Sequence, residues 1–307
     1  MVHMLDLALL EERLDQVPVL AGRPRSIERL SGGLTNVNLK VSTPAGVFVA
    51  RCFHGDAALL GIDRDAEHLN TRAAAAAGVG APVVDFRSDL ELLVIGFIDG
   101  VTYDNSSFAN PGVIERVAHA CRTLHSGPRF VNDFDMFARQ RGYLGIVRAH
   151  GFTLPTGYES YDERFHLVRE ALAARAEPTV PCNNDLLAGN FVDDGRKLWL
   201  IDYEYSGNND ACFELGNITT ECDLDGDQLE ELVSCYYGRP LRNKIARTRL
   251  QALVSQYGWS LWGAIQAATS PLDFDFAGWC TERYEKAVTG FTSDGFPRLL
   301  DEVQRVD

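Results

Sequence analysis

The amino-acid sequence predicts an α+β fold of two lobes, an antiparallel sheet with one helix followed by a mainly helical lobe. Two observations carry this prediction. In the first hundred residues, short segments rich in β-branched and aromatic residues are separated by turn signals. Beyond them, long segments with helical spacing of apolar residues dominate. We therefore place the N-lobe at residues 1–98 and the C-lobe at residues 99–307.

The N-lobe elements follow from local patterns. Thr43-Pro44-Ala45-Gly46 is a turn signal between two apolar runs and predicts a hairpin. An Ala-, Arg- and Glu-rich segment that stops at Gly78 predicts a helix. The expected elements, in order, are a helix over 5–17, strands over 25–30, 37–41 and 47–53, a helix over 63–77, and strands over 82–86 and 90–97. Together they form a five-stranded sheet crossed by one helix.

The C-lobe is predicted to be helical except at one place. Between residues 179 and 202 the pattern changes to a loop, a turn at Asp193-Asp194-Gly195 and an apolar strand over 197–201. The expected helices cover residues 111–125, 134–149 and 161–176, and most of the chain after residue 227. The interruption draws attention because it carries an unusual set of polar residues.

Bulk composition excludes several classes of function. The 307 residues carry a formal net charge of −14, which disfavours a nucleic-acid partner. Seven cysteines with no C-x-x-C pair suggest neither a disulfide framework nor a zinc site, and they fit a reducing compartment. Neither a signal peptide nor an apolar run of the ~20 residues needed to span a bilayer is found. We expect a cytoplasmic protein with no membrane insertion.

The polar residues of the interruption suggest phosphoryl transfer. That reaction needs one carboxylate to orient the attacking hydroxyl and oxygen ligands that hold magnesium against the phosphates. Asp185 and Asn190 lie five residues apart in a loop, and Asp202 follows the next strand. A hairpin between them would bring all three side chains together. Singly, each residue is an ordinary turn former, but the combined pattern is specific.

The run Cys182-Asn183-Asn184-Asp185, with Asn190 and Asp202, resembles the catalytic and metal-binding loops of protein-kinase-like small-molecule kinases. That group includes choline and ethanolamine kinases and aminoglycoside phosphotransferases. The resemblance implies a two-lobed protein-kinase-like fold with ATP and Mg²⁺ as cofactors. Asp185 would orient the acceptor hydroxyl, and Asn190 and Asp202 would bind the metal. Asn183 replaces the family histidine, which is expected to support the loop.

The N-lobe carries the nucleotide-binding part of the resemblance. Arg51 matches the family's phosphate-binding residue, and Glu67 in the next helix would pair with it. Backbone amides of the glycine-rich loop would meet phosphate oxygens, and the hinge at Phe97 and Ile98 would bind adenine. The loop residues assigned to the nucleotide are Ser31, Gly32, Gly33, Thr35 and Asn36. His125, at the end of a helix, is interpreted as structural.

The acceptor side resembles choline kinases most. The run Asp202-Tyr203-Glu204-Tyr205-Ser206 is followed by Phe213-Glu214-Leu215-Gly216-Asn217 and later by a W-x-L-W-x-x-x-Q signature. A quaternary ammonium is held by aromatic faces and nearby carboxylates. The residues implied for it are Glu204, Glu221, Trp259, Trp262 and Trp279. The leading hypothesis is therefore phosphorylation of choline to phosphocholine, with Arg51 and Asp185 as catalytic residues.

Several alternatives stay open. Ethanolamine, another amino alcohol, thiamine or an aminoglycoside could be the acceptor within the same fold. A catalytically silent binding protein of kinase fold is a minority hypothesis, motivated by Asn183. The absence of a G-x-S-x-G motif and of paired histidines argues against a hydrolase or a zinc enzyme. The partner is expected to be a small cationic alcohol, and a homodimer is left open.

Overall fold

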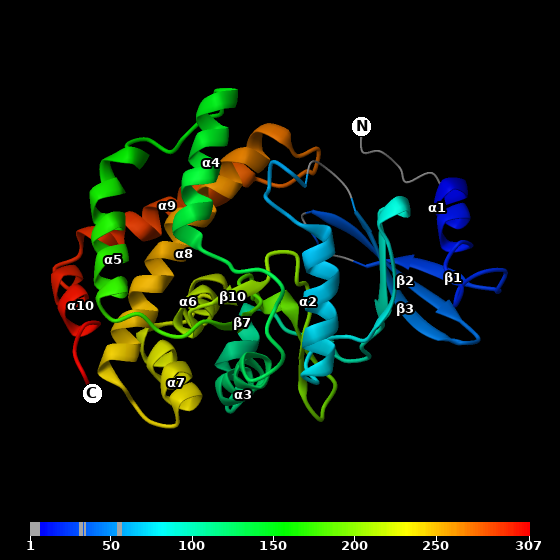
Figure 1. Cartoon of the computed structure of the whole chain (residues 1–307), viewed down its shortest axis with the longest axis horizontal. Coiled ribbons are helices and arrows are strands. Elements are labelled where there is room, and N and C mark those ends of the chain that lie inside the picture. The colour runs from blue at the N-terminus through cyan, green and yellow to red at the C-terminus, as the bar shows by residue number, and fades with distance from the viewer. Residues whose placement is uncertain (1–6, 31–32, 34, 54–56) are drawn as a thin grey trace.

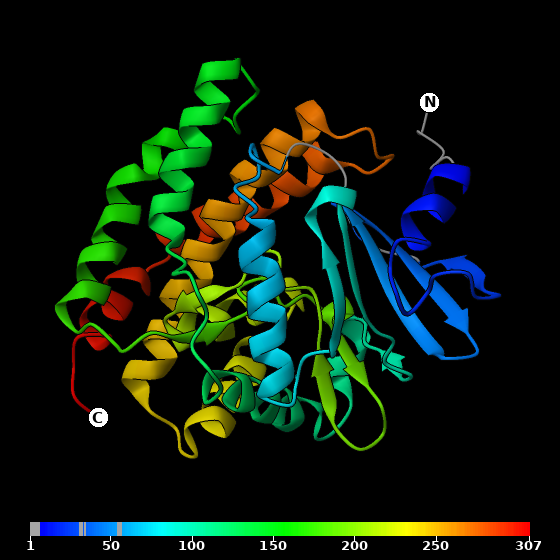
Figure 2. The same cartoon turned by 45° about the vertical axis from the view of Figure 1, so that its right-hand side comes forward.

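The computed structural model describes residues 7–30, 33, 35–53 and 57–307, with the side chains of residues 7–9 left aside. The N-lobe sheet and the helical C-lobe lie at opposite ends of the molecule (Figure 1). α2 stands between the sheet and the C-lobe helices in both views (Figure 2). The predicted α+β, protein-kinase-like architecture is confirmed.

The N-lobe sheet has five strands in the order β1-β2-β3-β5-β4, and every neighbouring pair is antiparallel. The expected hairpin pairs Thr43 with Gly46 across its turn. Asp63 caps α2 by accepting hydrogen bonds from the backbone amides of Asp65 and Ala66. The N-lobe elements are α1 (Leu7–Leu14), β1 (Ser26–Arg29), β2 (Asn36–Thr43), β3 (Gly46–Phe53), α2 (Arg64–Ala76), β4 (Val83–Arg87) and β5 (Leu92–Gly96).

Strand β5 separates two apolar clusters because successive side chains point to opposite faces of a sheet. Leu92 and Val94 join the cluster that α1 covers. Leu93 and Ile95 face the other way and pack with Ala81. The second face is the one that continues toward the C-lobe, so the sheet contributes an apolar wall between the lobes.

Helix α8 (Arg242–Thr269) is the centre of the C-lobe, where it packs against α4, α6 and α9. Every residue from Leu250 to Gln266 is buried, as expected of a helix surrounded by others. None of the helices described is long and apolar enough to cross a membrane. The other C-lobe helices are α3 (Val113–His125), α4 (Met136–His150), α5 (Asp162–Ala174), α6 (Ala211–Glu221), α7 (Gly226–Tyr237), α9 (Phe276–Thr292) and α10 (Phe296–Glu302).

Short strands carry the polar segment that the sequence singles out. β8 (Phe191–Asp193) and β9 (Leu198–Leu200) form a hairpin, and β6 (Val101–Thr102) pairs with β8. β7 (Val180–Cys182) pairs with β10 (Gly207–Asn209). The backbone N–H of Leu200 donates to the carbonyl of Val79, which lies between α2 and β4 (2.9 Å). This bond ties the hairpin to the N-lobe.

Close packing of α6 on α8 generates a stability prediction. A Cβ added at Gly216 would lie 2.7 Å from the backbone N of Ala252 and 2.8 Å from the backbone O of Thr248. Because backbone atoms cannot rotate away, Gly216→Ala should force the two helices apart. We expect a loss of about 1–3 kcal/mol in unfolding free energy, seen as a lower melting temperature by circular dichroism.

Gly226→Ala is the matched control, since a Cβ there meets nothing within 4 Å at the start of α7. Its melting temperature should stay at or above that of the parent chain, because alanine is the better helix former. Equal melting temperatures for Gly216→Ala and the parent would contradict the packing argument.

Candidate active site

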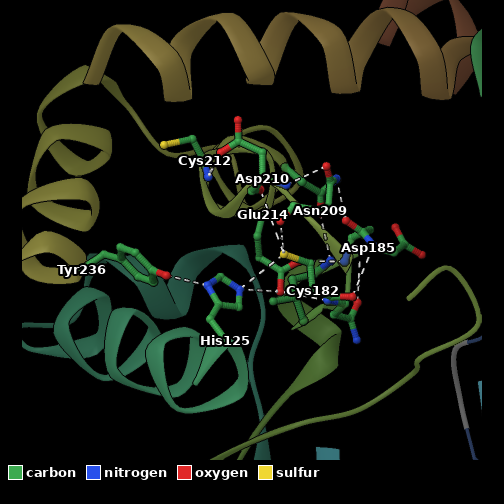
Figure 3. Close-up of polar contacts among 12 residues, drawn as sticks. His125, Cys182, Asp185, Asn209, Asp210, Cys212, Glu214 and Tyr236 are labelled. Carbon is green, nitrogen blue, oxygen red and sulfur yellow. Dashed lines mark hydrogen bonds and ion pairs between the residues drawn. The ribbon is translucent and has the colours of Figure 1, made fainter. Parts of the chain in front are cut away.

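Glu214 on α6 holds the loop that contains Asp185. Its side chain is fully buried, and its two carboxylate oxygens accept the backbone N–H groups of Asn183 (3.0 Å) and Asn184 (2.6 Å). One turn later, the side-chain oxygen of Asn217 accepts the N–H of Leu186 (2.9 Å). Side chains of helix α6 thus hold the backbone of this loop, which leaves the side chains of the loop available for other contacts (Figure 3).

His125 extends this arrangement away from the loop. Its Nδ1 lies 2.7 Å from the hydroxyl of Tyr236, and its Nε2 lies 3.4 Å from Glu214 Oε1 and 3.6 Å from Cys182 Sγ. In Figure 3, Tyr236 and Asp185 stand at opposite ends of this chain of contacts. Burial, reinforced by the charge of Glu214, raises the pKa of the Cys182 thiol well above its usual range.

The buried trio of His125, Cys182 and Glu214 is the metal-like cluster found among the described residues. A thiol that stays protonated is a poor metal ligand. Glu214 already accepts two amide hydrogens. These contacts support the predicted structural role of His125.

Asn183 connects Asp185 to Asp202. Its Nδ2 donates to the backbone carbonyls of Asp202 (2.7 Å) and Ile201 (3.2 Å), and its Oδ1 accepts the N–H of Asp185 (3.1 Å). Asp202 itself has a left-handed backbone with φ 64°. The amide therefore holds both predicted loops, which is the supporting role expected of the residue at this position.

Asn190 completes the predicted set. Its Nδ2 donates to the backbone carbonyl of Asp185 (2.7 Å), and its own carbonyl accepts the N–H of Ile201 (3.0 Å). The hairpin β8–β9 thus brings Asp185, Asn190 and Asp202 together as the sequence predicts. Burial, followed by the charges of Glu221 and Asp202, raises the pKa of Asp185 well above its usual range. The donor set is rich in oxygen, which suits a hard divalent cation such as Mg²⁺.

Arg51 links the N-lobe to this acidic centre. Its Nη2 lies 2.6 Å from Asp202 Oδ1 and 3.2 Å from Glu67 Oε1, and all three belong to different elements. Burial alone would lower the pKa of Arg51, but the charges of Asp202 and Glu67 raise it overall. The predicted pairing of Arg51 with Glu67 is present, and a third partner, Asp202, joins it.

Glu204 is held by the N-lobe. Its oxygens accept from Thr35 Oγ1 (2.6 Å) and Asn36 Nδ2 (2.8 Å), and Arg64 Nη1 lies 3.3 Å away. Burial, with the charges of Asp202 and Glu67, raises the pKa of Glu204 to about 7. Because both of its oxygens already accept hydrogen bonds from the N-lobe, Glu204 is less suited than Glu221 to contact the substrate.

The glycine-rich loop is described in part, since Ser31 and Gly32 lie outside the described residues. Gly33 has φ 89°, and a Cβ there would lie 2.9 Å from the carbonyl oxygen of Asn36. The loop therefore requires glycine at this position. The side chains of Thr35 and Asn36 point to Glu204, which leaves the backbone as the part suited to phosphate.

A narrow pocket lies between the lobes. Arg51, Glu67 and Asp202 line its polar end, and its apolar wall consists of Ala81, Leu93, Ile95 and Leu200. At the predicted hinge, the N–H of Phe97 donates to the carbonyl of Val47 (3.1 Å). Within the described chain, the backbone of Ile98 forms no hydrogen bond with the protein. The pocket thus combines an apolar slot with a polar end, where the Arg51 guanidinium lies between two carboxylates.

Two of the tryptophans predicted to hold the substrate contact Tyr205. Trp262 Nε1 donates to the Tyr205 hydroxyl (2.8 Å), and the rings of Tyr205 and Trp259 lie 4.8 Å apart. Trp279 packs edge-on against Trp262 at 5.3 Å. Trp259 and Trp262 are only 4% and 7% exposed, whereas Trp279 is half-buried.

Glu221 is connected to Trp279 through Arg283, whose guanidinium carbon lies 4.9 Å from the centre of the Trp279 ring. Its Oε2 accepts from Arg283 (2.8 Å), while Oε1 is buried without a hydrogen-bond partner among the described residues. Burial, partly offset by Arg283, raises the pKa of Glu221. The indole N–H of Trp259 is likewise buried and unpaired in the described chain. These two orphaned polar atoms are the features expected of a site that awaits a polar ligand.

Sequence reasoning assigned no role to several residues of the site, among them Arg64 and Tyr205. Arg64 forms ion pairs with Glu67 (2.7 Å) and Glu204. It lies in the first turn of the same helix as Glu67, and this proximity was a signal in the sequence. Tyr205 contacts Trp259 and Trp262. Its position next to Glu204 in the sequence motif could have indicated a place in the site.

Comparisons with known proteins agree with this geometry. The family model described as choline/ethanolamine kinase matches residues 27–233. A choline/ethanolamine kinase family protein from Mesorhizobium loti has a solved structure that is 32% identical, with a TM-score of 0.85 and coverage of 97% of this chain and 99% of that one. The fold of choline kinase LicA from Streptococcus pneumoniae matches with a TM-score of 0.79 and 24% identity. The match covers 93% of this chain and 98% of that one. A probable ethanolamine kinase from Arabidopsis thaliana is 27% identical over 85% of this chain and 78% of its own.

The two hydrogen bonds that Glu214 accepts from the loop backbone lead to a prediction. Glu214→Gln keeps the shape, but one amide N–H₂ then faces a backbone N–H. We expect a loss of about 1.5–3 kcal/mol in unfolding free energy, measured by urea denaturation.

Glu230→Gln is the matched surface control, because Glu230 forms an exposed ion pair with Arg249. That change should cost less than about 1 kcal/mol. If both variants lose the same amount, the buried hydrogen bonds of Glu214 do not anchor the loop.

Proposed function

The chain belongs to the choline/ethanolamine kinase family, whose members transfer phosphate to an alcohol group, and we propose that it phosphorylates choline with Mg²⁺-bound ATP. The observation that carries this proposal is the contact of Arg51 with Asp202 beside Asp185. A cation for phosphate, an oxygen-rich metal site and a free carboxylate meet there, between an apolar nucleotide slot and an aromatic cluster.

On the donor side, Arg51 supplies positive charge to the phosphates and Glu67 keeps it oriented. Asn190 and Asp202 would hold Mg²⁺, which supplies charge that offsets the negative charge of the transferred group. Arg51 and Asp202 form an ion pair with each other. Nucleotide binding would therefore exchange this ion pair for contacts of Arg51 with phosphate.

On the acceptor side, Asp185 orients the hydroxyl and takes its proton. Its loop is fixed by Glu214 and Asn217, so the carboxylate is presented in one position. Glu221 supplies the negative charge for a cationic nitrogen through its unpaired Oε1. Trp279, the most exposed of the three indoles, supplies an aromatic face.

Ethanolamine is the second candidate. A primary ammonium donates hydrogen bonds, and the unpaired Oε1 of Glu221 is an acceptor suited to it. Trp259 and Trp262 present little surface to a bulky trimethylammonium group in this structure. The Arabidopsis relative is named as a probable ethanolamine kinase. Asn183, which motivated a silent binding protein, instead supports an active loop through its three hydrogen bonds.

Asp185→Asn tests the catalytic assignment. The amide keeps the shape of the loop but cannot take the hydroxyl proton, so turnover with choline or ethanolamine should fall by about 10²-fold or more. Coupled detection of ADP release measures turnover, and calorimetry should show Mg²⁺-ATP binding close to that of the parent. Asp89→Asn, an exposed residue paired with Arg87, is the control and should leave both values unchanged. Near-normal turnover of Asp185→Asn would refute this role.

Trp279→Leu separates the two acceptors. Loss of the aromatic face should raise the KM for choline about 3- to 30-fold. The KM for ethanolamine should change less, because hydrogen bonds to a carboxylate hold a primary ammonium. A panel of amino alcohols assayed with the parent and this variant gives both ratios. If choline is not a substrate of the parent, or if both KM values rise equally, the choline assignment fails.

A further inference from the structure

A second hollow lies on the surface away from the nucleotide pocket. It is formed by α3, the β8–β9 hairpin and the turn after α2, and its volume is about 320 Å³. Its lining is unusually basic for this protein. The charged and titratable residues that line it are Arg116, His119, Arg122, Arg196, Lys197 and one acid, Glu115.

Three of these cations have no carboxylate partner. Arg116 is neutralised by Asp193 through two hydrogen bonds of 2.6 and 2.7 Å. In contrast, no described carboxylate lies within 4.0 Å of Arg122, Arg196 or Lys197. The whole chain has 43 acidic and 29 basic residues, so acids are in ample supply. The clustering of unpaired cations in one hollow is therefore a local feature and does not follow from the composition.

Neutral contacts hold two of the cations in place. Arg122 donates to the backbone carbonyls of Cys235 and Tyr236. Lys197 donates to the carbonyl of Gly78 (2.5 Å), with its Nζ 3.4 Å from the centre of the Trp199 ring. Carbonyls and rings orient a cation without cancelling its charge, so these groups keep donors and charge for a ligand.

We propose that this hollow binds a small phosphate-bearing anion. Arginine and lysine donors that converge on a concave space suit a compact group with several acceptor oxygens. A small molecule fits better than a nucleic acid or an acidic protein, because the net charge of −14 would repel a large polyanion beyond the hollow.

The position of the hollow connects it to the nucleotide pocket. Leu198 lines the hollow, and Leu200, in the same strand, lines the nucleotide pocket two residues before Asp202. Val79 also lines the hollow and accepts the N–H of Leu200. An anion bound here would thus contact the strand that leads to the predicted metal ligand.

The experiment titrates the full chain with inorganic phosphate, without Mg²⁺, nucleotide or acceptor, and follows backbone amides by ¹H–¹⁵N NMR at constant ionic strength. Saturable shifts are expected at Gly78 and Lys197. Arg196→Glu should weaken this binding about 5- to 30-fold. Arg196 is exposed, so the variant should fold. Arg23→Glu, an exposed residue in the N-lobe, makes the same change in net charge and should bind like the parent.

The proposal fails if no saturable shift occurs, if the shifts are confined to Gly33 and Asp202 in the nucleotide site, or if both variants bind phosphate equally. Lys197→Gln is a second test of the same donors and should also weaken binding. Because no turnover is measured, failure here would leave the kinase proposal intact, and loss of kinase activity would leave this one intact.

Discussion

The hydrogen bonds of Glu214 are the constraint on which the candidate site depends. A fully buried carboxylate is costly unless donors satisfy it, and here the amides of Asn183 and Asn184 do so. Once those amides are fixed, the side chain of Asn183 reaches the carbonyl of Asp202 and accepts the N–H of Asp185, which fixes the position of Asp185. The close approach of α6 to α8 at Gly216 fixes the helix that carries Glu214. A core packing contact therefore determines where the chemistry can occur.

Charge balance explains how the two lobes meet. The carboxylates of Glu67, Asp202 and Glu204 share two guanidinium groups, those of Arg51 and Arg64. Burial is the main cause of the raised pKa values of Glu204 and Asp185, and neighbouring negative charges, including that of Asp202, add to it. Such a centre favours the arrival of a divalent cation, since added positive charge relieves the repulsion. The same residues join the N-lobe to the C-lobe, so the proposed binding of metal and nucleotide would be coupled to the contact between the lobes.

Most of the fold follows from local signals, because alternation, turn residues and caps such as Asp63 act over a few residues. The loop residues Asp185, Asn190 and Asp202 were also predictable, since one hairpin brings them together. The partners of Glu204 were not, because Thr35 and Arg64 are distant in sequence and only the tertiary fold joins them. Nor does the helical spacing of Trp259 and Trp262 show how little of each ring reaches solvent. Spacing gives the direction of a side chain, whereas burial depends on every neighbouring element.

The left-handed backbone of Asp202 limits how this family member can change during evolution. Asparagine and aspartate tolerate φ near 60°, whereas most other side chains are disfavoured there. A glutamate at this position would keep the charge but strain the chain. The substitution most compatible with the backbone is therefore asparagine, which would remove the negative charge of the predicted metal ligand while preserving the fold. Descendants that lose catalysis could arise here by a single step and persist as stable pseudoenzymes.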